Sequence, residues 1–204
     1  MSVTTEVPAL LALDPVAQDL LFRDARTANT FTDEPVTEEQ LQAIYDLAKW
    51  APTAMNSQPL RLVAVRSKEA RERLVGYMAE GNRAKTATAP LTVILAADVD
   101  FHEHLPRVFP HAPGLKDNFN DEQARAGLAG KQAWLQAGYF ILAIRAAGLA
   151  AGPMSGFDAA GVDADLLAGT TLRSFAVVNI GQPGPDAWMQ RNPRLEHKEV
   201  VSVL

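Results

Sequence analysis

The sequence predicts an α+β fold, because helical and strand patterns do not alternate regularly along the chain. Helical patterns come first, followed by a strand, a helix, a strand, a loop-rich segment, a long helix and a final strand. Neither a Gly-x-Gly-x-x-Gly fingerprint nor a P-loop motif occurs, so no dinucleotide-binding βαβ unit is expected. The 204 residues contain no internal repeat or long linker, so we expect a single domain over residues 1–204.

The first three helices are indicated by their start signals. We expect a helix over residues 15–25, which begins with a proline directly after an aspartate. Thr37 and Gln40 fit a capping box, and the apolar residues that follow recur at helical spacing until Pro52. A serine that can cap precedes a third helix, expected over residues 68–80.

The strands and the long helix follow from apolar patterning. Residues 61–66 alternate and are rich in valine, and residues 91–97 and 175–180 are apolar runs typical of central strands. Residues 101–120 are rich in Pro, His and aromatic residues, which indicates a lid or loop. Residues 122–149 predict a long helix whose second half is apolar on nearly every face. Such a helix belongs at the centre of the core, in a subunit interface, or in both.

Composition excludes several classes of protein. The chain has no cysteine, which excludes disulfides, thiolate nucleophiles, thiolate zinc sites and iron–sulfur clusters, so redox activity would need a bound cofactor. A net charge of −5 argues against a nucleic-acid partner. No stretch approaches the roughly 18 apolar residues of a membrane span, and the first 15 residues lack the basic leader of a signal peptide. We therefore expect a cytoplasmic protein with no membrane partner.

The stretch GPMSGFD, residues 152–158, raises the question of a serine nucleophile. A nucleophile elbow needs glycine two residues before and two after the serine, and neither position around Ser155 holds one. The simplest alternative is a turn after the long helix, with Gly152 as its cap and Gly156 in a left-handed conformation. A third interpretation keeps this turn and lets its free backbone N–H groups bind an acceptor atom of a ligand.

Other polar groups admit a structural and a functional reading. His102, His104 and His111 gather in the predicted lid, but no further ligands complete a metal site, so we expect no metal. The hydroxyl and amide side chains of residues 52–59 fit either a polar helix-capping loop or a loop that binds a polar planar ring. The basic residues that could reach one phosphate are scattered along the chain, as surface charges usually are.

Six stretches in this order carry a family resemblance: ARTANTF (25–31), KWAPTAMNSQPLRLVAV (49–65), GNRAKTATAPLTVI (81–94), LPRVFPH (105–111), GLAAGPMSGFD (148–158) and GTTLRSFAVVNIGQP (169–183). The sequence resembles the FMN-dependent nitroreductase family along nearly its whole length. The motifs GNRAKT, FPH and GPMSGFD resemble the branch of malonic semialdehyde reductases of pyrimidine degradation (3-hydroxypropionate dehydrogenase type).

The resemblance implies a central mixed or antiparallel sheet flanked by helices. It also implies an intertwined homodimer with the long helix in the interface and the C-terminal segment around the partner. One FMN per active site would lie at that interface and contact residues from both chains.

The resemblance also implies which residues bind the cofactor. Where the family has the pattern R-x-S-x-[RK], this chain has Ala25 first and Asn29 last, so the charge for the phosphate must come from elsewhere. The residues that match the phosphate and ribityl segment are Arg26, Thr27 and Asn29, and the tail arginines Arg191 and Arg194 are candidates for the phosphate.

The remaining matches concern the flavin ring. The loop that the partner contributes matches Pro52, Thr53, Ala54, Asn56 and Gln58, and the residues facing the N1/O2 edge match Asn82 and Lys85. The turn under the flavin matches Pro153, Met154, Ser155 and Gly156, with the backbone N–H groups of Ser155 and Gly156 directed at N5 and O4. No catalytic side chain is implied, because the flavin carries the hydride chemistry.

The expected activity is that of an FMN-dependent NAD(P)H oxidoreductase with two half-reactions, which reduces malonic semialdehyde to 3-hydroxypropionate. The alternatives are a broad-specificity nitroreductase or quinone reductase, and a flavin-binding protein without turnover. The sequence leaves the choice between NADH and NADPH open.

Overall fold

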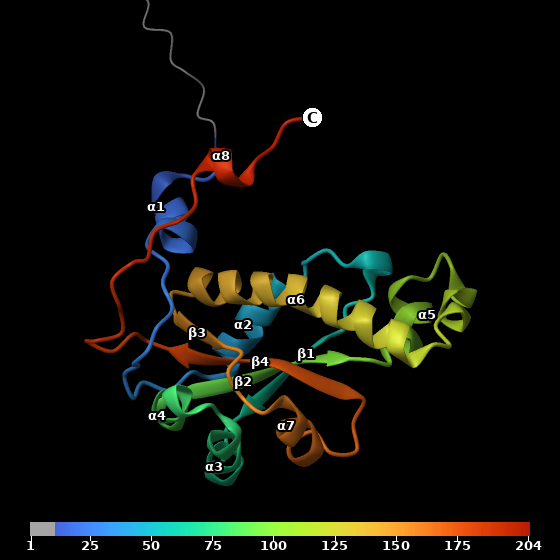
Figure 1. Ribbon diagram of the computed structural model, residues 1–204, viewed down its shortest axis with the longest axis horizontal. Helices are drawn as coiled ribbons and strands as arrows, with labels where there is room; N and C mark the ends of the chain where they lie inside the picture. Colours follow the sequence, from blue (N-terminus) through green and yellow to red (C-terminus); the bar gives the residue numbers. More distant parts are fainter. Residues whose placement is uncertain (1–10) are drawn as a thin grey trace, which may run out of the picture.

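The computed structural model describes residues 11–204 and builds them around a four-stranded sheet (Figure 1). The strands are β1 (Leu60–Val65), β2 (Leu91–Asp98), β3 (Ala150–Met154) and β4 (Leu172–Gly181). Their order is β1-β2-β4-β3, and every neighbouring pair is antiparallel. This confirms the α+β prediction and, of the two expected sheet types, selects the antiparallel one.

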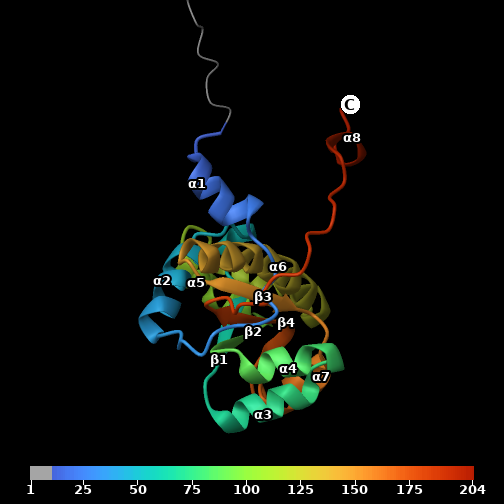
Figure 2. The same ribbon diagram turned by 90° about the vertical axis from the view of Figure 1, so that its left-hand side faces the viewer.

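Two layers of helices enclose the sheet (Figures 1 and 2). On one face lie α2 (Glu38–Ala48) and α6 (Glu122–Ala146), whose Ile44 and Phe140 are fully buried against β2 and β4. On the other face lie α3 (Lys68–Tyr77), α4 (Glu80–Thr88) and α7 (Ala159–Asp165). Because both faces are covered, all eight residues of β2 are buried, as its continuous apolar run predicts.

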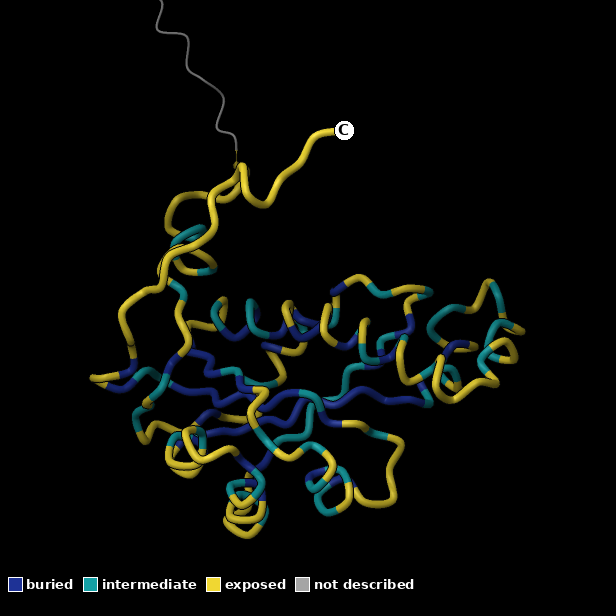
Figure 3. Tube along the Cα trace, viewed as in Figure 1, coloured by how far each residue is buried: buried dark blue, intermediate teal, exposed yellow. Residues whose placement is uncertain are grey.

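The N-terminal and C-terminal segments project away from this layered body. Figure 2 shows α1 (Pro15–Gln18) and α8 (His197–Val200) above the α6 layer, and Figure 3 shows that these segments are mostly exposed. The expected helix over 15–25 is shorter, because its second half, Asp19–Arg23, is a π-helical turn. The expectation for the first 15 residues, the lack of a signal peptide, concerns mainly residues 1–10, which lie outside the described residues.

The predicted helix over 68–80 is in fact two helices. The backbone of Met78 and Ala79 is extended, with ψ values of 143° and 147°, and this separates α3 from α4. Met78 is buried and forms a β-bridge with Phe157, which explains the break. The second helix, α4, is the element that carries Asn82 and Lys85.

The long helix ends three residues earlier than predicted, and its cap is Gly148 rather than Gly152. Gly148 has a φ of 75°, its N–H donates to the Arg145 carbonyl, and the Leu149 N–H donates to the Ile144 carbonyl. These bonds form a Schellman motif. Gly152 instead lies inside β3, and the expected left-handed conformation of Gly156 is wrong, because the only described glycines with positive φ are Gly148 and Gly169.

The lid over 101–120 contains short helical turns: Phe101–His104, α5 (Leu105–Val108) and Pro113–Asn118. Phe101 and Leu105 are fully buried against the N-terminal part of α6 and anchor it. Among residues 11–204, none of the helices is both long and apolar enough to cross a membrane.

Candidate functional site

Three arginines surround one cavity at the edge of the sheet next to β3. Arg26, Arg191 and Arg194 line a cavity of 270 Å³, and no carboxylate is among the described residues around it. The side chain of Arg26 donates to the Met189 carbonyl at 3.3 Å, and that of Arg191 donates to the Ala25 carbonyl at 3.2 Å. An uncompensated set of guanidinium groups is suited to a phosphate. The other residues that line the cavity are Ala25, Thr27, Asn29, Met189, Gln190 and Asn192.

Backbone hydrogen bonds fix this segment to the sheet. The N–H of Ala28 donates to the carbonyl of Ala151 in β3 at 3.0 Å, and the N–H of Asn29 donates to the Ala187 carbonyl at 3.0 Å. Residues 25–31 therefore lie between the edge strand and the C-terminal tail. Sequence reasoning did not choose between Arg191 and Arg194, and the structure brings both to the same cavity.

A fourth arginine, Arg145, lies beside this cavity and was not among the predicted site residues. It lines a neighbouring cavity of 440 Å³ together with Arg26, Asp19 and Asp24, so this second cavity carries charges of both signs. Burial, and secondarily the charge of Arg191, lower the pKa of Arg145. Its position near the end of the apolar α6 gave no signal that it would approach residues 26 and 191.

Helix α4 brings Asn82 and Lys85 to the same region. The Nζ of Lys85 lies 3.5 Å from the Oδ1 of Asn29, and the Nδ2 of Asn82 donates to the Gly156 carbonyl at 3.0 Å. Arg71 of α3 donates to the carbonyls of Thr86 and Ala89 at the end of α4. These bonds join α4 to α3 and to the residue pair that follows β3, and burial lowers the pKa of Arg71.

The end of β3 supplies free backbone donors. Pro153 and Met154 belong to β3, which is an edge strand, and Ser155 and Gly156 follow it directly. Among the described residues, the N–H groups of Ser155 and Gly156 donate to no backbone carbonyl outside the strand ladders. Free N–H groups at a strand edge are available to an acceptor atom of a ligand.

Two glycines allow these segments to meet. A Cβ on Gly152 would lie 2.7 Å from the Ala28 carbonyl oxygen, and a Cβ on Gly156 would lie 2.9 Å from the Asn82 Nδ2. Gly152 therefore needs to be glycine, because it faces a backbone oxygen, whereas a Cβ on Gly156 would meet the end of a flexible side chain. This corrects the prediction of a helix cap at Gly152 and a left-handed turn at Gly156. The donor set of three guanidinium groups, one ammonium group and free amides fits an anionic, planar cofactor such as FMN.

The loop of residues 52–58 lies elsewhere in the chain. The Ala54 N–H donates to the Gln132 Oε1 at 2.8 Å, and the Asn56 side chain donates to the Val108 carbonyl of the lid at 2.8 Å. Figure 1 shows this loop beside the α5 end of α6, far from α4. The structure therefore does not bring Pro52, Thr53, Ala54, Asn56 and Gln58 together with the other predicted site residues within one chain.

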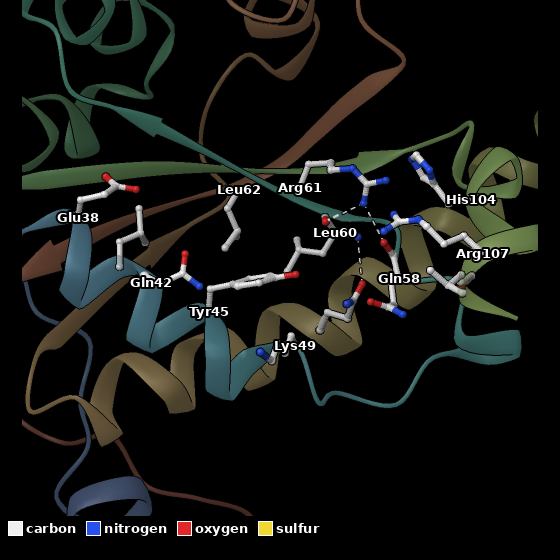
Figure 4. Close-up of a pocket in the computed structure, with 14 residues that line it drawn as sticks. Glu38, Gln42, Tyr45, Lys49, Gln58, Leu60, Arg61, Leu62, His104 and Arg107 are labelled. Atoms are coloured by element: carbon white, nitrogen blue, oxygen red, sulfur yellow. Dashed lines mark hydrogen bonds between the residues drawn. The ribbon is translucent and has the colours of Figure 1, made fainter.

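A cavity of 510 Å³ adjoins this loop between α2, β1 and the lid (Figure 4). Gln58 is the only predicted site residue that lines it. The side chain of Arg61 in this cavity is already hydrogen-bonded within the protein: it donates to Asp98 at 2.6 Å and to the Gln58 carbonyl at 2.8 Å. The Nε2 of His104 lies 3.7 Å from the Oδ2 of the same aspartate.

The histidines of the lid do not assemble with other ligands. The ring of His111 packs on that of Phe109, with 3.8 Å between the ring centroids. Within residues 11–204, no group of three or more His, Cys, Asp or Glu side chains is arranged to hold a metal ion.

Comparisons with known proteins agree with this fold. The Nitroreductase family model matches residues 23–182. A Streptomyces griseus protein that carries the provisional name NADH dehydrogenase/NAD(P)H nitroreductase is 63% identical over 195 residues, which are 95% of this chain and 99% of that protein. The chain belongs to the nitroreductase family.

Solved structures share the fold at low sequence identity. A nitroreductase-type protein from Exiguobacterium sibiricum, solved in complex with FMN, superposes with a TM-score of 0.81 at 16% identity and covers 95% of this chain and 98% of that one. A gut-bacterial enone reductase of fatty acid saturation superposes with a TM-score of 0.79 at 18% identity and covers 94% of this chain and 99% of that one. Proteins that are named for different substrates, nitro compounds and enones, thus share this fold.

Proposed function

We propose that this protein is an FMN-dependent NAD(P)H oxidoreductase. The observation that carries the proposal is the basic cavity of Arg26, Arg191 and Arg194. Lys85 contacts Asn29 at this cavity, and Asn82 of the same helix contacts Gly156, whose backbone amide is free. When bound, FMN would accept a hydride from NAD(P)H at N5 in one half-reaction and pass it to the second substrate in the other. The family membership and the names of the relatives support this assignment.

Each part of the chain has a distinct role in this proposal. The three arginines would hold the phosphate, with Thr27 and Asn29 beside them. Lys85 and Asn82 would face the N1/O2 edge of the flavin, where the positive charge of Lys85 would stabilise negative charge. The amides of Ser155 and Gly156 would bind N5 and O4, and Pro153 and Met154 would support the ring. No side-chain nucleophile is needed.

A homodimer completes this site. The predicted contacts of residues 52–58 would come from the partner chain, because hydrogen bonds hold this loop to the lid and to α6 of its own chain. The long helix also presents an exposed apolar stripe, in which Trp134 is 51% exposed and Leu135 and Tyr139 are each 42% exposed. A second copy would cover this stripe and bring its own loop to the flavin.

The finer proposal concerns the substrate. The motifs GNRAKT, FPH and GPMSGFD favour malonic semialdehyde, reduced to 3-hydroxypropionate in the cytoplasm. The name of the 63% identical relative favours the alternative, a broad-specificity nitroreductase or quinone reductase.

An absorbance scan and anaerobic turnover of the purified protein test both levels. We expect flavin bands from the protein, bleaching by NADPH or NADH, and recovery of the bands on addition of malonic semialdehyde. Recovery with nitroaromatics and quinones alone would support the alternative substrate class. A protein that neither contains nor binds FMN would contradict the whole proposal, and flavin bands without bleaching would indicate a flavin-binding protein that does not turn over.

A further inference from the structure

Trp134 lies on α6 beside the end of β3, at a place that no motif of the sequence indicated. It lines a cavity of 150 Å³ together with Pro153, Met154 and Ser155. The rest of the cavity wall is apolar and comes from the sheet and from the same helix: Leu95, Ala137, Ile141, Ala176 and Val178. This cavity therefore joins the proposed flavin-binding turn to an aromatic side chain.

One neighbouring ring supports the indole. Its centroid lies 4.7 Å from that of Phe175 in β4, and the two ring planes are inclined by 55°. Gly138, one turn further along α6, is itself exposed and has no side chain that could cover the indole. The indole therefore remains accessible at the cavity.

The polarity of the whole region matches an amphipathic ligand. The cavity around Arg26, Arg191 and Arg194 is basic, whereas the cavity at Trp134 is lined mainly by apolar side chains. FMN has a phosphate at one end and an apolar benzenoid ring at the other. An aromatic side chain that is half exposed in the single chain gains by stacking against such a ring.

We propose that Trp134 is a cofactor-binding residue whose indole forms an apolar wall for the flavin ring. The inference rests on the proposed FMN-dependent function and goes beyond it by adding a side-chain contact from α6 to the backbone contacts of β3. The competing explanation is that Trp134 serves only to pack against a second copy, since it also belongs to the exposed stripe of α6.

The test compares three variants prepared as apoprotein and titrated with FMN. Trp134→Ala removes the wall, and we expect the Kd for FMN to rise about tenfold, which corresponds to about 1.4 kcal/mol. Trp134→Phe keeps an aromatic surface and should restore most of the affinity. Tyr139→Ala is the matched control, because Tyr139 is an exposed aromatic residue of the same helix but does not line the cavity.

A second readout reports contact directly. An indole in van der Waals contact with a flavin quenches the flavin fluorescence by electron transfer, so bound FMN should be dark in the wild type and brighter in Trp134→Ala. Sedimentation of each variant shows whether the oligomeric state has changed.

The outcomes separate the inference from the function on which it rests. If wild-type apoprotein does not bind FMN, the proposed function fails. If it binds FMN but Trp134→Ala changes neither the Kd nor the fluorescence of bound flavin, the proposed function stands and the role of Trp134 is overturned. Equal losses of affinity in Trp134→Ala and Tyr139→Ala, accompanied by dissociation, would assign Trp134 to subunit packing instead.

Discussion

Gly156 lies close to the side chain of Asn82. A Cβ added at Gly156 would lie 2.9 Å from the Asn82 Nδ2 and 3.4 Å from the Ala79 Cβ. Gly156→Ala should therefore displace the flexible Asn82 side chain, break its bond to the Gly156 carbonyl, and destabilise the fold by about 1 kcal/mol. Denaturant unfolding and FMN titration measure the two effects. Unchanged stability and affinity would show that α4 moves freely relative to β3.

Substitution of Ser155, the residue before Gly156, is expected to have little effect. We infer that its backbone N–H contacts the cofactor while its hydroxyl group does not act as a nucleophile. Ser155→Ala keeps the amide and should retain bound flavin and most of the turnover with NAD(P)H. Abolished turnover in a variant that still binds flavin would contradict this role and revive a role for the hydroxyl group.

Lys85 is expected to affect the rate at which NAD(P)H reduces the flavin. Its ammonium group lies near Asn29 and within the basic region, so it can stabilise the negative charge of the reduced flavin. Lys85→Ala should slow flavin reduction by NAD(P)H about a hundredfold, the magnitude seen when one preorganised donor is removed. Stopped-flow kinetics measure this rate, and Lys131→Ala, an exposed lysine on α6, is the control. Reduction as fast as in the wild type would place Lys85 away from N1.

At the scale of elements, the helices and strands with strong apolar periodicity could be predicted from the sequence. Elements that form only through pairing with distant segments could not. The capping box of Thr37 and Gln40 and the buried run of β2 are both present as predicted. Strand β3 was missed because its sequence, AAGPM, contains glycine and proline and has no apolar alternation. It is a strand because it pairs with β4, and proline is tolerated on an edge strand.

The site residues were predicted by resemblance rather than by pattern, and the reason is physical. Arg26, Lys85 and Arg191 are far apart in the sequence, and no local periodicity indicates that they approach one another. Their proximity depends on the break between α3 and α4 and on the pairing of residues 25–31 with β3 and the tail. Trp134 was concealed for a similar reason, because an apolar residue in an apolar helix gives no functional signal.

The contact between α3 and α7 should make the stability of the fold depend on pH. Asp165 of α7 accepts from the Arg73 Nε at 3.0 Å and from the Tyr77 hydroxyl at 3.2 Å. The hydrogen bond from Arg73 is the main reason that the pKa of Asp165 lies below its ordinary value of 3.8. A carboxyl group with a depressed pKa in the folded state stabilises the protein above its unfolded pKa, and this stabilisation disappears as the pH falls through the folded value.

Asp165→Asn should therefore lower the free energy of unfolding at neutral pH, and the difference from the wild type should shrink as the pH falls below 3.8. Denaturant unfolding at a series of pH values measures this difference. Glu69→Gln, an exposed carboxylate on α3, is the control. A difference that stays constant down to the lowest pH at which the protein folds would show that the carboxylate charge is not what joins α3 to α7.

At the scale of the whole molecule, the proposed flavin site has two halves that lie apart in the described chain. In this proposal the basic cavity, α4 and the end of β3 form one half, and the loop of residues 52–58 forms the other. The exposed apolar stripe of α6 and the projecting terminal segments indicate that a second copy joins them. The wild type should therefore sediment as a dimer, and Leu135→Asp should dissociate it because a charge in an apolar interface is costly. A wild type that sediments as a monomer would remove the proposed homodimer.

Co-expression of two inactive variants tests whether each site draws on both chains. Lys85→Ala impairs the first half of the site, and Ala54→Glu places a charged side chain at an exposed position of the second half. If the halves come from different chains, a mixed dimer contains one site with both defects and one intact site. Random pairing of equal amounts then restores about a quarter of the wild-type turnover, since half of the dimers are mixed and each has one working site of two. If both halves come from the same chain, every site keeps one defect and turnover remains at the average of the two variants.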